Sequence, residues 1–169
     1  ELADVLLFEE KFNQALIYYS QIDENMKGAP IGQEASLKTA KTSYYKGDFE
    51  WASHQLKVLK SASSLLIAND ALEMFLIISD NTVADSTQVA LKKFARADYL
   101  LYQNKKAASL TQFQDILKEH KGEEIEAITL LRMGTIYEKM GDFVKALDCY
   151  NTIITTLKES IYVDEALYF

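Results

Sequence analysis

The chain of 169 residues contains one proline and six glycines. An all-β sandwich or barrel needs many tight turns, and these two residues are their usual material. Their scarcity argues strongly against an all-β architecture and favours helices joined by short loops.

Three further shortages narrow the class of protein. The single cysteine, Cys149, cannot form a disulfide within the chain, which excludes a cross-linked framework but leaves the compartment open. Apolar runs such as 62–66 and 74–78 stop well short of the roughly 18 residues that cross a bilayer, so we expect no transmembrane segment. The formal charge is −7 and the lysines are scattered, which argues against a nucleic-acid partner.

What the sequence does contain is a pattern that starts at positions 10, 47, 104 and 141. It is clearest in Gly47-Asp48-Phe49 and Gly141-Asp142-Phe143. Small residues precede and follow each start at constant spacing, namely Ala3, Ala40, Ala97 and Gly134 before it, and Ala15, Ala52, Ser109 and Ala146 after it. Closely packed helices need small side chains where they cross, so each start is expected to join an antiparallel helix pair.

The turns between the paired helices also have sequence signals. Asp48 and Asp142 follow a glycine and are predicted to cap the second helix with a side-chain oxygen. Glu10 and Asn104 stand where the glycine would be, which predicts less sharp or slightly strained turns. The third turn is expected to be the loosest, because Lys106 replaces the phenylalanine of the other units.

The pattern resembles the tetratricopeptide repeat family, most closely from Leu130 to Ile153. There the residues that match the family's large, small and aromatic positions are Leu130, Met133, Gly134, Tyr137, Gly141, Phe143, Ala146 and Tyr150. Ile153 and Lys158 depart from the family's usual small residue and closing proline. The resemblance implies an all-α fold, a right-handed solenoid of antiparallel helix pairs forming a superhelix.

We predict a single domain over residues 1–169, with units at about 1–28, 32–64, 86–121 and 123–158 and the start of a fifth at 162–169. An inserted helix is predicted at about 68–80, with Asn69 as its possible cap. A polar connection over 81–86 would follow, and Ser86 would cap the next helix. The segment 46–57 is also similar to longer bacterial repeat proteins, and we interpret the chain as a fragment of such a protein.

In such a solenoid the first helices line a concave surface that binds a peptide or helix of another protein. Helical spacing predicts that this surface comprises Phe8, Lys38, Lys41, Tyr45, Asp98, Tyr102, Arg132, Thr135 and Lys139. Phe8, Tyr45 and Tyr102 fall at one place in successive units and would form an aromatic row, although packing between units is an alternative role for these rings. The charged members fit a carboxylate clamp poorly, since asparagines are missing and Asp98 would repel an anion; a solvated helix face is the alternative.

No catalytic or metal site is predicted. His54 and His120 have no second histidine or cysteine at ligand spacing, and every glycine is isolated, which leaves no phosphate-binding loop. Cys149 has no histidine nearby in sequence and is expected to be a small, partly buried residue. We therefore expect no enzyme activity and no cofactor.

The function predicted from these observations is a protein-binding module or scaffold. A peptide-sensing regulatory domain, and an architectural spacer in a larger cell-envelope or multiprotein assembly, are the alternatives. Exposed apolar ends of the repeat stack could also lead to self-association.

Overall fold

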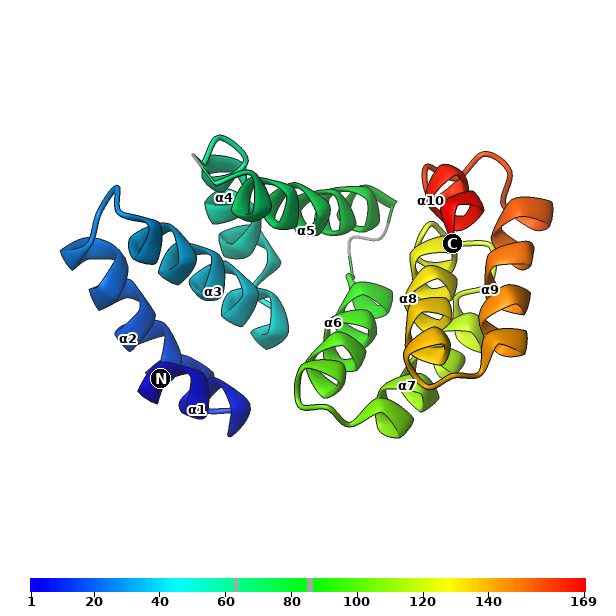
Figure 1. Cartoon of the computed structure of the whole chain (residues 1–169), viewed down its shortest axis with the longest axis horizontal. Helices are drawn as coiled ribbons and strands as arrows, with labels where there is room; N and C mark the ends of the chain where they lie inside the picture. Colours follow the sequence, from blue (N-terminus) through cyan, green and yellow to red (C-terminus); the bar gives the residue numbers. More distant parts are fainter. Residues whose placement is uncertain (63, 85–86) are drawn as a thin grey trace. The chain divides into compact units, whose positions relative to one another are not determined.

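The computed structural model describes residues 1–62, 64–84 and 87–169, with the side chains of residues 83 and 84 left out (Figure 1). Every regular element in these ranges is an α-helix. The prediction of an all-α protein is therefore confirmed.

The helices form two compact units, residues 1–80 and residues 81–169, which are described separately. Unit 1 contains α1 (Leu2–Phe8), α2 (Phe12–Asn25), α3 (Pro30–Lys46), α4 (Phe49–Leu59) and most of α5 (Leu65–Ala84). Unit 2 contains α6 (Val89–Tyr102), α7 (Lys106–Glu119), α8 (Ile125–Lys139), α9 (Phe143–Thr156) and α10 (Val163–Tyr168). Consecutive helices pack against each other from α1 to α4 and from α6 to α10.

The small residues of the repeat pattern are buried where the paired helices meet. All of them are buried, namely Ala3, Ala15, Ala40, Ala52, Ala97, Ser109, Gly134 and Ala146. The Ser109 hydroxyl donates a hydrogen bond of 2.8 Å to the carbonyl of Ala97, which confirms that this pair of small residues faces across α6 and α7. Gly134 differs, because its nearest neighbour on α9 is the ring of Tyr150.

The four turns between paired helices have the same backbone geometry. Glu10 and Asn104 take φ values of 66° and 59°, the left-handed conformation that Gly47 and Gly141 take at 86° and 79°. In each turn the amide of this residue and that of the next bond back to the first helix, at 2.8 to 3.1 Å. Of the two outcomes predicted at Glu10 and Asn104, the slightly strained turn is confirmed and the less sharp turn was wrong. The two backbone bonds set the turn, and the non-glycine residues accept a strained φ. The third turn makes both bonds at 2.8 Å, so the expectation that it would be the loosest was wrong as well.

The two predicted aspartate caps behave differently. Asp142 accepts a hydrogen bond of 3.3 Å from the amide of Lys145, as predicted. Asp48 makes no such bond with its helix, so that prediction was wrong. The physical difference is the residue three positions on: the Lys145 ammonium lies 2.6 Å from the Asp142 carboxylate and holds it over the helix end, whereas Trp51 at the matching position offers no charge.

The inserted helix exists but is longer than predicted. α5 begins at Leu65 and extends to Ala84, so residues 81–84 are helical rather than a polar connection. Its first turn uses Ser64 instead of Asn69, since the Ser64 hydroxyl accepts a hydrogen bond of 3.5 Å from the amide of Ile67. The predicted cap Ser86 lies outside the described residues.

The two units are related by a constant shift of 94 positions. Of the seven residues of positive φ in the described ranges, six form three pairs at this shift, 10 with 104, 28 with 122, and 47 with 141. The helix-capping dihedrals agree as well: φ and ψ are −90° and 70° at Asp48, and −91° and 71° at Asp142. Identical residues at the same shift include Ala3 and Ala97, Asp4 and Asp98, and Gly47-Asp48-Phe49 and Gly141-Asp142-Phe143. A helical module therefore occurs twice in this chain, which gives residues 1–75 internal counterparts at positions 95–169.

Candidate binding surface on the first helices

The predicted surface residues lie on the first helix of each pair. In unit 1, Phe8 is the last residue of α1, and α3 carries Lys38, Lys41 and Tyr45. In unit 2, α6 carries Asp98 and ends at Tyr102, and α8 carries Arg132, Thr135 and Lys139. Ala95, which precedes Asp98 by three residues on α6, is 1% exposed and contributes to the core.

In unit 1 the Lys38 ammonium joins α1 to α3. Its Nζ lies 2.9 Å from the Asp4 carboxylate and 3.1 Å from that of Glu34. The Tyr19 hydroxyl donates a hydrogen bond of 2.7 Å to the same Asp4 carboxylate. Partial burial raises the pKa of Asp4, but the hydrogen bonds from Tyr19 and Lys38 outweigh it and lower the pKa to about 2. Lys38 therefore serves a contact within unit 1.

Lys41, one turn further along α3, pairs with the inserted helix. Its Nζ lies 3.0 Å from a carboxylate oxygen of Asp70 on α5. Both side chains are about one-third exposed, at 33% and 39%, so this pair lies at the surface of unit 1.

In unit 2 the counterpart pair joins α6 to α8. Arg132 Nε lies 3.5 Å from an oxygen of Asp98, and these two residues are the counterparts of Lys38 and Asp4. The Asp98 side chain is 13% exposed, against 38% for Asp4, so this pair is the more buried one. The Thr135 hydroxyl donates to the Arg132 carbonyl at 2.9 Å. An acid and a base at corresponding places thus connect neighbouring first helices in both units.

Three members of the surface are exposed, namely Phe8, Tyr102 and Lys139. Phe8 is 50% exposed and Tyr102, its counterpart in unit 2, is 39% exposed. Tyr102 stacks on Tyr99 with ring centroids 6.1 Å apart, and the half-buried Tyr45 has its ring centroid 5.6 Å from that of Tyr44. Lys139, the counterpart of Tyr45, is exposed at the end of α8. Phe8 and Tyr45 lie in unit 1 and Tyr102 lies in unit 2, so the aromatic row stays a prediction.

Two titratable residues outside this surface, Cys149 and His120, were considered in the sequence as candidates for chemistry. Cys149 is 7% exposed, and burial raises the pKa of its thiol to about 11, which is the opposite of what a nucleophilic cysteine needs. His120 Nδ1 lies 3.1 Å from the Glu123 carboxylate. Within the described ranges, no group of three or more histidine, cysteine, aspartate or glutamate side chains could hold a metal ion.

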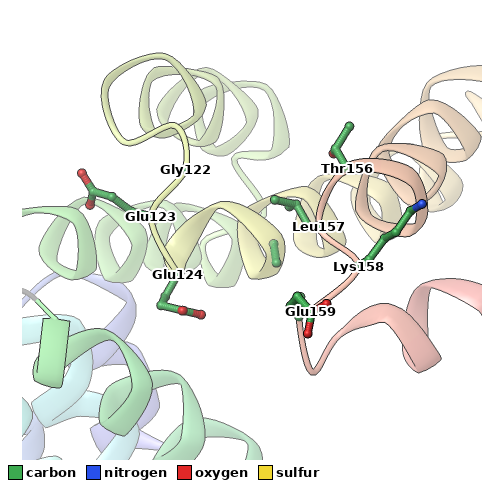
Figure 2. Close-up of a pocket in the computed structure, with 9 residues that line it drawn as sticks. Gly122, Glu123, Glu124, Thr156, Leu157, Lys158 and Glu159 are labelled. Atoms are coloured by element: carbon green, nitrogen blue, oxygen red, sulfur yellow. The ribbon is translucent and has the colours of Figure 1, made fainter.

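One hollow in unit 2 was not predicted from the sequence. It measures about 230 Å³ and lies between the connection of α7 to α8 and that of α9 to α10, lined by Gly122, Glu123, Glu124, Ala127 and residues 156–160. Figure 2 shows that the charged ends of Glu123, Glu124, Lys158 and Glu159 point in different directions rather than toward one point. Its two walls lie almost thirty residues apart in the sequence, so no local sequence pattern predicts it.

The architecture defines a class: an all-α protein of consecutively packed helices with an internally repeated module. Comparison with known proteins gave no match to a family model, to a curated protein or to a solved structure. In the part of the chain that the structure describes, none of the helices has both the length and the apolar character needed to cross a membrane.

Proposed function

We propose that this chain is a protein-binding module of the tetratricopeptide-like kind, which holds a peptide or helix of a partner protein on its first helices. The repeat pattern of small residues and glycine turns supports the family assignment. The direct contact of α6 with α8, the first helices of successive pairs, is the packing that such a stack requires.

The observation that carries the proposal is that three basic residues of the surface are paired within the protein, whereas two of its aromatic residues are exposed. Lys38, Lys41 and Arg132 are engaged with carboxylates of their own unit. Phe8 and Tyr102 keep between a third and a half of their surface accessible at corresponding places in both units. Aromatic side chains on a frame that is already ordered contribute much of the free energy of typical interfaces. The partner is therefore expected to be recognised by apolar contact and not through a carboxylate clamp.

The test is site-specific photo-crosslinking in lysate of the source cells. A photoreactive phenylalanine derivative is placed at Phe8 or at Tyr102, and at Val58 on α4 as a matched control that is 76% exposed. We expect Phe8 and Tyr102 to capture one shared protein, identified by mass spectrometry, and Val58 not to capture it.

The captured protein is then titrated against alanine variants. Tyr102→Ala and Phe8→Ala should each weaken binding by about 2 kcal/mol, or roughly 30-fold, while Val58→Ala stays at the parent affinity. Thermal melts of the variants confirm that folding is retained. Equal capture at all three positions would contradict the proposal, and capture at none would favour an architectural spacer.

A further inference from the structure

The sole tryptophan of the chain lies in an open, acidic hollow on α4. This hollow, which we call the Trp51 site, is lined by Asp48, Glu50, Trp51 and His54. Trp51 is 56% exposed, although tryptophan is usually among the more buried residues. No ion pair or side-chain hydrogen bond of Asp48 or Glu50 is found among the described residues.

The corresponding turn of unit 2 shows how the aspartate of this turn pairs with a basic side chain. In unit 2 the counterpart of Asp48 is Asp142, whose carboxylate lies 2.6 Å from the Lys145 ammonium. Lys145 is the counterpart of Trp51, so unit 1 has an exposed tryptophan at the place where unit 2 has the base. Glu50 adds a second carboxylate where unit 2 has Val144.

We propose that the Trp51 site binds a lysine or arginine side chain of a basic segment in a partner protein. The cationic group takes the place that the Lys145 ammonium has in unit 2, next to the Asp48 carboxylate. Its aliphatic stem lies on the indole face, which also attracts the cation through the ring quadrupole. The net charge of −7 further favours a basic partner. This site is separate from Phe8 and Tyr102, so the two proposals fail independently.

The experiment follows the single indole N–H signal of Trp51 by NMR while tetralysine amide is added at about 0.15 M salt. Tetralysine with acetylated side chains is the uncharged control peptide. We expect the indole signal to shift with tetralysine and to stay in place with the acetylated peptide. An indole signal that tetralysine does not move, or that the acetylated peptide moves equally, would overturn the proposal.

A pair of variants of equal net charge separates the site from general attraction between a basic peptide and an acidic protein. Asp48→Asn should raise the Kd about three- to fivefold, the range of a partly exposed ion pair, and Asp142→Asn should leave it within about twofold. Trp51→Lys, measured by calorimetry, should lose binding because the new ammonium occupies the place beside Asp48. Equal weakening by Asp48→Asn and Asp142→Asn would show diffuse attraction and refute the assignment.

Discussion

The packing of Gly134 against Tyr150 predicts an energetic coupling that the duplicated module makes testable. In unit 1 the counterparts are Ala40 and Leu56, each fully buried, and in unit 2 Tyr150 is 3% exposed. The smaller residue, Gly134, thus occurs with the large ring of Tyr150, and the larger residue, Ala40, occurs with the smaller side chain of Leu56. We predict that Gly134→Ala and Tyr150→Leu, which together recreate the unit 1 pair, compensate each other.

The expected magnitude follows from the distances. A methyl group on Gly134 would lie 2.3 Å from Cε1 and 2.7 Å from Cζ of Tyr150, whereas carbon atoms normally pack about 3.5 to 4 Å apart. Overpacking of this kind costs about 1 to 3 kcal/mol, and the higher helix propensity of alanine returns about 1. Gly134→Ala should therefore lower the free energy of unfolding by about 1 kcal/mol. Tyr150→Leu should lower it by about 2, because it leaves a cavity and removes the hydrogen bond to Glu138.

In the double variant the methyl group enters the space that the ring has left. The double variant should therefore lose about 1 kcal/mol less free energy of unfolding than the sum of the losses in the two single variants. Urea unfolding followed by far-ultraviolet circular dichroism measures all three variants. Gly134→Ala combined with Val58→Ala, an exposed residue on α4, is the control and should be additive. Additivity within about 0.5 kcal/mol for the Gly134 and Tyr150 pair, or a stabilising Gly134→Ala, would refute the assigned contact.

Three other predictions concern the ion pair, the turns and the thiol. Because the pKa of Asp4 is lowered to about 2, the ionised Asp4 stabilises the folded protein above about pH 4, and this contribution is lost as the pH falls toward 2. After allowance for the 38% exposure of its side chain, we expect the contribution to be at most about 1 kcal/mol. The Asp4→Asn variant should therefore lose less stability than the parent protein when the pH is lowered over this range. Glu10→Gly should raise the free energy of unfolding by about 1 kcal/mol by relieving its positive φ, and Gly141→Ala should lower it by a similar amount although an added methyl meets no atom; urea titrations showing the same sign for both would contradict this account. Cys149 should react with a thiol reagent at pH 8 much more slowly in the native protein than in urea, and equal rates would mean that the thiol is accessible.

Local chemistry in the sequence was enough to predict the helical class and the places of the turns. Small residues at constant spacing mark helix crossings because few side chains permit close approach, and the contact of Ser109 with Ala97 bears this out. The sequence was less informative where two local choices compete. At Glu10 the residue type predicted either a less sharp turn or a slightly strained one, and the backbone bonds of the turn decided for the strained one.

The predicted surface shows a similar division. Helical spacing placed Lys38 and Arg132 on the first helices, but it did not reveal that each meets an acid of the preceding first helix. The acids, Asp4 and Asp98, stand 34 residues earlier in both cases, a distance at which only the packing of one helix pair on the next determines contact. The Trp51 site was missed for a related reason, because its meaning emerges only when Trp51 is compared with Lys145 in the second module.

Taken by itself, the order of amino acids determined that this chain forms helices, where most of them end, and which positions must be small, since these properties depend on neighbours within a few turns. Only the tertiary structure decided which charged side chains neutralise one another and which aromatic rings stay accessible. Those outcomes depend on side chains brought together from separate helices, where geometry and desolvation decide between pairing and exposure.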